Sequence, residues 1–170
     1  MDAENAHPAE SRPPTIADLL LICRSLNALE ARYLVVGGFA VNQHGFPRTT
    51  MDIDLLLEDS LGNQAKVKQA LEILPDKAVR ELGEDDLRDW VVVRVADEVV
   101  VDLMTAAGGV SYADAQPEIQ IFTIDGIPIP FASPKLLLRT KQTHREKDAE
   151  DRFFLERKIA AETERAARRP

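Results

Sequence analysis

The chain has 170 residues, of which 45% are apolar and 29% are charged, and its formal net charge at pH 7 is −8. This length and composition are typical of one globular domain with a buried core, and they exclude a disordered or fibrous chain. The charge is uneven, because residues 133–170 carry a net charge of +4 and the rest of the chain −12, so most of the molecule is a poor non-specific binder of nucleic acid.

The first segment in chain order, residues 1–14, is acidic and rich in proline, and it lacks the basic and apolar regions of a secretory signal. We therefore expect a flexible tail. No segment of the sequence approaches the roughly 18 apolar residues that span a membrane. The one cysteine, Cys23, cannot form an internal disulfide and is expected in the core of an early helix. These features predict a cytoplasmic protein with no membrane attachment.

Helical and strand patterns alternate in the first half of the chain. They predict a helix, a strand, a short helix, a strand and a helix, over residues 15–33, 33–38, 39–46, 51–58 and 59–75. Thr15 follows two prolines and is a candidate N-cap for the first helix. Gly45 and Pro47 should end the short helix. The strand over 51–58 is mostly apolar, which is typical of a strand covered on both faces.

Two hairpins are predicted next, over residues 90–104 and 119–132. The first has a tight turn at Ala96-Asp97-Glu98. The second turns at Asp125-Gly126, a pair typical of type I′ turns. The order of these elements indicates an α/β (α+β) fold in which helices flank a small mixed sheet.

The C-terminal segment is predicted to be helical, with Ser133 as its N-cap, Pro134 at the first helical position and a break near Thr143-His144. Its positive charge could attract a phosphate-rich ligand, or it could belong to a solvated helix with ion pairs between successive turns. We divide the chain into three parts: a tail over residues 1–14, a core over 15–132 and a helical segment packing on the core over 133–170.

Three aspartates are the clearest sign of chemistry. Asp52 and Asp54 lie two residues apart in a strand, so their side chains point to the same face, where like charges repel unless a cation lies between them. Asp102 is the only charged residue of another apolar strand, and a lone carboxylate there is costly to bury unless it is paired or bound to a metal. Such ligands suit Mg²⁺ or Mn²⁺. Two such ions can bind both the attacking and the leaving oxygen of a phosphoryl transfer. The alternative is a set of exposed carboxylates at a strand edge.

Two glycines precede the first of these strands. Gly37 and Gly38 follow a predicted strand and open a helix. The absence of side chains would let backbone N–H groups approach a phosphate at the start of that helix. A glycine pair after a strand is more often only a turn, but here Arg48 and the Asp-x-Asp strand follow it.

The segment GGFAVNQHGFPRTTMDIDLLL, residues 37–57, resembles the signature of the DNA polymerase beta-type nucleotidyltransferase superfamily. The segment SPKLLLRTKQTHREKDAEDRFFLE, residues 133–156, is similar to the ending of small stand-alone bacterial and archaeal members. These include minimal nucleotidyltransferases, lincosamide and aminoglycoside nucleotidyltransferases, and toxins of abortive-infection-type toxin–antitoxin pairs. The resemblance covers residues 34–155. It implies a nucleotidyltransferase fold.

The resemblance also implies roles for individual residues. Asp52 and Asp54 would bind the metal ions and the nucleoside triphosphate, and Asp102 would act as a third metal ligand or as the base for the acceptor hydroxyl. The implied nucleotide-binding set is Gly37, Gly38, Arg48, Lys141, Arg145 and Lys147. The spacing between Lys141 and Arg145 is one residue shorter than the family pattern, so Lys135 or Arg139 could take the role of Lys141. Lys141 could also be an ordinary solvated lysine.

The implied function is the Mg²⁺- or Mn²⁺-dependent transfer of an NMP from an NTP such as ATP to an acceptor hydroxyl, with release of pyrophosphate. The acceptor could be an RNA 3′ end such as that of tRNA, a protein or a small molecule, and the biological role could be that of a toxin with an antitoxin partner. One alternative is a catalytically degenerate protein of this fold that binds nucleotide or a partner protein. Another is an interaction protein whose last helix binds a partner.

The remaining notable side chains have ordinary explanations. His44 is expected at a helix end or in the core rather than as a base. Trp90, Phe153 and Phe154 are expected in the core, because the chain holds too few aromatic residues to suggest a platform for stacking bases.

Overall fold

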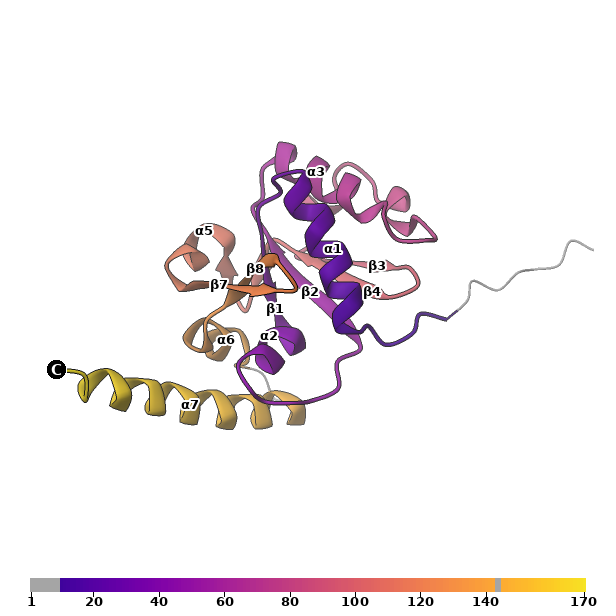
Figure 1. Cartoon of the computed structure of the whole chain (residues 1–170). Coiled ribbons are helices and arrows are strands. Elements are labelled where there is room, and N and C mark those ends of the chain that lie inside the picture. Colours follow the sequence, from indigo (N-terminus) through magenta and orange to yellow (C-terminus); the bar gives the residue numbers. More distant parts are fainter. Residues whose placement is uncertain (1–9, 143–144) are drawn as a thin grey trace, which may run out of the picture.

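The computed structural model describes residues 10–142 and 145–170 and centres on a six-stranded mixed β-sheet (Figure 1). The sheet has the order β3-β4-β2-β1-β8-β7. Its strands are β1 Tyr33–Val36, β2 Asp52–Leu57, β3 Val92–Ala96, β4 Val100–Met104, β7 Ile119–Ile124 and β8 Ile127–Ala132. Every strand that the sequence predicts is present, which confirms the α/β class with a mixed sheet.

Five helices match the predicted ones: α1 Ile16–Ala28, α2 Gly37–Gln43, α3 Leu61–Leu71, α6 Pro134–Thr140 and α7 Glu146–Ala167. Thr15 and Asp18 form a capping box at the start of α1, and the Ser133 hydroxyl accepts a hydrogen bond from the Leu136 backbone N–H at the start of α6. The helix α2 begins two residues earlier than predicted, so both glycines belong to its first turn. The predicted break at Thr143-His144 lies outside the described residues, between α6 and α7.

Shorter elements connect these and were not predicted, because single turns carry too little periodicity to stand out. They are the 3₁₀ helices Ala78–Glu81 and Gln116–Glu118, the helices α4 Asp86–Asp89 and α5 Tyr112–Ala115, and a two-stranded ribbon of β5 Ala106–Ala107 and β6 Val110–Ser111. No helix within residues 10–142 and 145–170 has the length and apolar character needed to cross a membrane.

The strand pairing places polar groups at one level of the sheet. The strands β2 and β4 run parallel, with Asp54 opposite Asp102, while β1 pairs with β2 and β3 with β4 in antiparallel fashion. The β7–β8 hairpin turns at Asp125 and Gly126 with φ angles of 49° and 78°. Two successive positive φ angles match the predicted type I′ turn.

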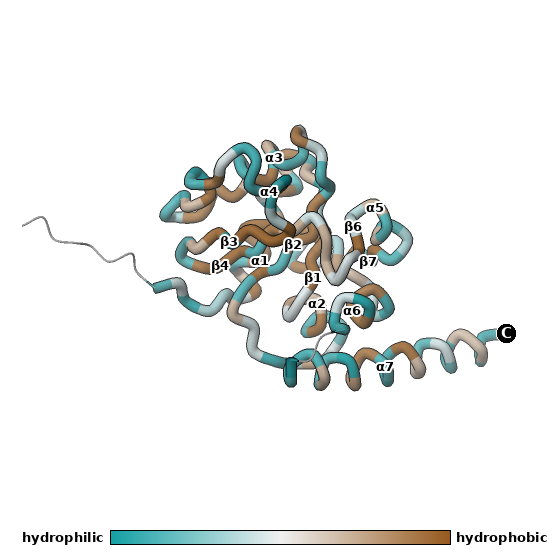
Figure 2. The backbone as a smooth tube through the Cα atoms, turned by 180° about the vertical axis from the view of Figure 1, so that it is seen from behind, coloured by the Kyte–Doolittle hydropathy of each residue, from teal (hydrophilic) through white to brown (hydrophobic). Residues whose placement is uncertain are grey.

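The core forms where α1 and α3 cover the sheet, and its apolar strands are the brown segments at the centre of Figure 2. Cys23 is buried in α1, as predicted. His44 caps the C-terminus of α2 and is also buried, and its Nε2 lies 2.8 Å from the Ala132 carbonyl oxygen. The C-terminal half of α7 extends beyond α2 and α6 (Figures 1 and 2).

Two of the three aromatic residues expected in the core are on the surface. Trp90 is 66% exposed and Phe153 is 63% exposed, so that expectation was wrong for both. Phe154 is partly buried against the core. Sequence alone could not separate these cases, because adjacent aromatic residues on a helix point in different directions.

The start of the described chain lies against the core. Part of the expected tail, residues 10–14, contacts the loop between β3 and β4: the Arg12 backbone N–H donates to the Glu98 carbonyl at 2.9 Å, and the Ser11 hydroxyl donates to the Asp97 carbonyl at 2.6 Å. The Arg12 guanidinium also pairs with Asp18 at 2.7 Å. Residues 1–9 lie outside the described residues.

The same loop depends on a buried carboxylate. The side chain of Asp97 accepts hydrogen bonds from the backbone N–H groups of Asp76, Ala78 and Glu98 at 3.0, 2.9 and 2.8 Å. Asp97 is 2% exposed. It therefore joins the β3–β4 turn to the segment after α3, a role that its place in a predicted turn did not indicate.

Replacing Asp97 by Ala should lower the free energy of unfolding by roughly 2–4 kcal/mol, because three backbone N–H groups lose a charged acceptor in a buried site. Urea denaturation followed by circular dichroism measures this. The matched control is Asp89→Ala, which removes an exposed ion pair with Arg88 and should change the stability by less than about 1 kcal/mol. Equal effects of the two substitutions would contradict the structural role given to Asp97.

Candidate active site

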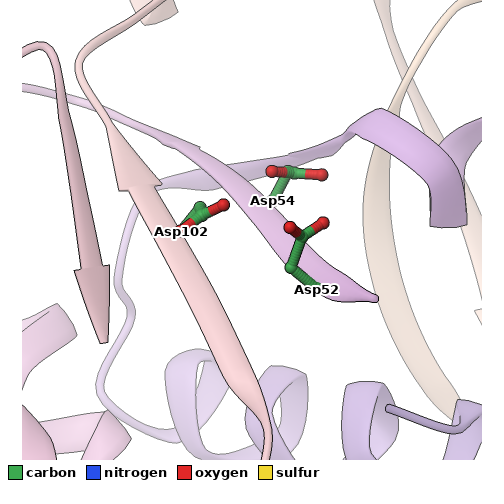
Figure 3. A group of neighbouring side chains, drawn as sticks. All are labelled: Asp52, Asp54 and Asp102. Carbon is green, nitrogen blue, oxygen red and sulfur yellow. The ribbon is translucent and has the colours of Figure 1, made fainter. Parts of the chain in front are cut away.

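Three aspartates converge on one face of the sheet (Figure 3). Asp52 and Asp54 project from β2, and Asp102 projects from the neighbouring β4. One carboxylate oxygen from each residue lies within 4.8 Å of the others. The prediction that Asp52 and Asp54 share a face follows from the two-residue repeat of a strand, and the parallel register of β2 and β4 adds Asp102 to the group.

Two of the three carboxylates, Asp52 and Asp54, have a raised pKa. Burial raises the pKa of Asp54 to about 7, and the charges of Asp52 and Asp102 contribute to the same effect. Burial, followed by the charge of Asp102, also raises the pKa of Asp52. The cluster therefore holds more negative charge than its surroundings stabilise, which is the condition under which a bound cation gains most.

One cation of the chain already lies among these carboxylates, and the sequence analysis missed it. Arg94 on β3 faces Asp102 across the strand pair, and its Nε and Nη2 donate to the two Asp102 carboxylate oxygens at 2.9 Å each. Its Nη2 also donates to Asp52 at 3.2 Å. These bonds raise the pKa of Arg94, with Asp102 as the main cause. A signal was present, because Arg94 is the only charged residue of its strand, as Asp102 is of β4.

The two glycines have different neighbours. Gly37 has a φ of 67°, and a Cβ atom there would lie 2.7 Å from the Asp54 Cγ. A side chain is therefore excluded both by the backbone conformation and by the Asp54 carboxylate. A Cβ atom on Gly38 would instead lie 2.8 Å from the Cβ of Thr50. Gly38 thus allows the loop before β2 to approach α2.

An open cavity of about 640 Å³ covers the aspartates. Its lining includes eight of the residues that the sequence analysis singled out: Gly37, Arg48, Asp52, Asp54, Asp102, Lys141, Arg145 and Lys147. Gly38, Lys135 and Arg139 are not among the described residues that line it. The geometry therefore favours Lys141 over Lys135 and Arg139 at this cavity, and it gives Gly38 a packing role instead of direct contact with a ligand.

Two cations that line the cavity, Arg48 and Lys141, are held by a buried carboxylate. Asp151 of α7 is completely buried; its Oδ2 accepts from Arg48 Nη2 at 3.0 Å and lies 3.2 Å from Lys141 Nζ. Lys141 Nζ is also 3.4 Å from Asp148, and its side chain is only 13% exposed. Lys141 is therefore not a solvated lysine. The sequence analysis gave Asp151 no role, although it lies one helical turn after Asp148 and shares its face.

A glycine turn closes the cavity beside Lys141. Gly108, between β5 and β6, has a φ of 53°, and a Cβ atom there would lie 2.8 Å from the Thr140 Cα. The β5–β6 turn therefore packs against the C-terminal end of α6 at backbone distance. The Gly108-Gly109 pair was the available sequence signal for this close approach.

No family model and no curated protein matches the sequence, but solved structures resemble the fold. The crystal structure of TM1012 from Thermotoga maritima, a candidate nucleotidyltransferase, is 18% identical, covers 96% of this chain and 97% of its own, and superposes with a TM-score of 0.50. The solution structure of the antibiotic-resistance factor ANT(2'')-Ia is 14% identical, covers 90% of this chain and 95% of its own, and has a TM-score of 0.49. The likeness to TM1012 shows that the chain has a nucleotidyltransferase fold.

Replacing Asp54 by Asn should stabilise the metal-free protein at neutral pH. The folded state raises the pKa of Asp54 from 3.8 to about 7, so the folded state binds more protons than the unfolded state between these values and loses stability as the pH rises through them. The variant lacks this loss. Its advantage in unfolding free energy should be close to zero at pH 4 and reach roughly 1–4 kcal/mol at pH 8.

Urea denaturation at both pH values, in the presence of EDTA, measures this difference, and Asp76→Asn is the control because Asp76 is exposed and far along the chain from the cluster. An Asp54→Asn variant that is less stable than the wild type at pH 8 would show that the cluster is not electrostatically strained.

Proposed function

We propose that the protein is a metal-dependent nucleotidyltransferase, which transfers an NMP from an NTP to an acceptor hydroxyl and releases pyrophosphate. The observation that carries this proposal is one cavity lined by charges of both signs. Three carboxylates from β2 and β4 line it together with Lys141, Arg48, Arg145 and Lys147. A triphosphate bound to divalent cations has the matching arrangement of charge.

The carboxylates fit a divalent cation on two grounds. The donor set consists of oxygens alone, which suits Mg²⁺ or Mn²⁺. A guanidinium from Arg94 already bridges Asp102 and Asp52, so the cluster can hold a positive charge at this position. Asp52, Asp54 and Asp102 would be the ligands. When bound, such ions neutralise the charge of the phosphates and of the displaced oxygen.

The chain's own groups would position the substrates. Lys141, held by Asp151 and Asp148, would contact the β- and γ-phosphates, and Arg145 and Lys147 would add positive charge at the rim of the cavity. The missing side chain of Gly37 leaves the Asp54 carboxylate its space, and the bare backbone there would let a phosphate approach the start of α2. The Asp102 carboxylate would accept the proton of the acceptor hydroxyl, as a general base.

The finer parts of the proposal rest on the resemblance of the sequence motifs. The acceptor would be an RNA 3′ end such as that of tRNA, a protein or a small molecule, with ATP as one candidate donor. The biological role would be that of a toxin whose activity a partner antitoxin controls. The convergence of all three carboxylates supports an active enzyme over a degenerate protein that only binds nucleotide.

The wild-type protein should transfer label from at least one α-³²P-labelled NTP in the presence of Mg²⁺ or Mn²⁺ when it is incubated with cellular RNA, protein extract and small-molecule extract in separate reactions. The variants Asp54→Asn and Asp102→Asn should lower the transfer rate by at least about a hundredfold. Each removes a carboxylate that would bind the metal ions at the phosphate being transferred. Asp76→Asn should keep the wild-type rate.

The labelled fraction identifies the acceptor: RNA, protein or small molecule. Transfer that survives in Asp54→Asn would contradict the site assignment. Metal-dependent NTP binding without transfer to any fraction would contradict the enzymatic proposal and favour the degenerate protein.

Replacing Arg94 by Gln should strengthen the binding of Mn²⁺ to the nucleotide-free protein by about tenfold, because the guanidinium and the metal compete for the same oxygens of Asp52 and Asp102. The expected change is moderate because the Arg94 side chain is 61% exposed and its charge is screened by water. Electron paramagnetic resonance of free Mn²⁺ measures the affinity directly. Arg88→Gln, which loses only exposed ion pairs, is the control, and unchanged or weaker Mn²⁺ binding by Arg94→Gln would refute the competition.

A further inference from the structure

The helix α7 carries an apolar groove on a stripe other than its fully buried one. Phe46 and six α7 residues line this groove, which has a volume of about 740 Å³ and which we call the α7 groove. The six residues come in pairs one turn apart, at positions 149–150, 153–154 and 157–158. A spacing of four residues keeps them on one stripe of the helix.

The α7 groove adjoins the packing that holds α7 in place, because Phe46 and Phe154 also pack against the core. The buried side chains of α7 are Asp148, Asp151 and Leu155, which form a different stripe. Within the groove, Phe154 stacks on Phe46 with ring centroids 5.1 Å apart, while Phe153 is 63% exposed and has the Arg157 guanidinium 5.6 Å from its ring centroid. A large exposed aromatic side chain beside an apolar hollow is typical of a surface that another molecule covers.

Two of the three charged residues that line the α7 groove, Glu150 and Arg157, lie symmetrically about its centre, and Lys158 is the third. Glu150 lies three residues before Phe153, and Arg157 lies three residues after Phe154. A second α7 laid antiparallel across this midpoint would therefore place its Arg157 beside Glu150 and its Glu150 beside Arg157. Such an arrangement is the condition for an isologous two-fold contact, in which one patch binds its own copy.

We propose that the α7 groove binds the same groove of a second copy of this chain, with the two α7 helices antiparallel. Phe153 of each protomer would pack against the Phe154–Phe46 stack of the other, and two Glu150–Arg157 ion pairs would flank this apolar centre. The C-terminal half of α7 extends beyond α2 and α6 (Figures 1 and 2).

The size of the contact sets the expected affinity. With 22 residues, α7 is about 33 Å long. One helix face and one loop residue form an interface at the small end of the range for specific dimers, so we expect a dissociation constant in the micromolar range. The proposal does not depend on nucleotidyl transfer, because neither Phe153 nor Arg157 lines the cavity over the aspartates.

Sedimentation velocity of the full chain between about 1 and 200 μM tests the dimer. The wild type should shift from monomer to dimer over this range. Glu150→Arg and Arg157→Glu should each weaken the dimer at least tenfold, and the double variant should recover most of the wild-type affinity because the opposite charges meet again. Glu162→Arg, an exposed charge reversal on another side of α7, should leave the dimer unchanged.

A second pair of variants tests the apolar centre. Phe153→Ser should keep the protein monomeric at 200 μM, while Leu61→Ser, at a residue that is 72% exposed on α3, should not affect dimerisation. Circular dichroism confirms that each variant is folded. A wild type that is monomeric at every concentration, a double charge reversal weaker than both single ones, or a dimer that survives Phe153→Ser would overturn the proposal, as would a groove that binds lipid vesicles while the protein stays monomeric.

Discussion

The repulsion among three carboxylates on one face of the sheet is the constraint around which this molecule is arranged. The pairing of β2 with β4 brings Asp52, Asp54 and Asp102 together, and burial makes the charges of Asp52 and Asp54 costly. Two features of the fold accommodate these carboxylates. Arg94 supplies a positive charge that pairs with Asp102, and the absence of a side chain at Gly37 leaves space for the Asp54 carboxylate. Strain of this kind, held by the surrounding structure, is typical of functional sites.

Elsewhere in the cavity lining the arrangement of charge is reversed. There a single buried carboxylate, Asp151, fixes two cations, Arg48 and Lys141, that come from distant parts of the chain. The C-terminal segment is therefore part of the site and not only a helix packed on a finished core. Charged side chains of this cavity are thus positioned by neighbouring groups of opposite charge.

Sequence patterns predicted the major elements and most of the charged residues around the cavity, because the Asp-x-Asp strand, the glycine pair and the basic C-terminal helix each have a local signature. What they missed depends on contacts between distant segments. The ion pair of Arg94 requires the register of β3 and β4, and the burial of Asp97 requires knowledge of which backbone amides surround the turn. Phe153 and Phe154 are adjacent in sequence but differ in burial, which only the placement of α7 decides.

The parallel register of β2 and β4 has a consequence for how this chain can vary. Side chains alternate between the two faces of a sheet, so a shift of β4 by one residue would turn Asp102 into the apolar core and bring Val101 or Leu103 to the cavity. Chain length between Ala96 and Val100 is thus under constraint, although this turn lies at the end of the hairpin and contributes no residue to the cavity lining. Insertions and deletions should accumulate in other surface loops and avoid this one, in contrast to the usual tolerance of hairpin ends.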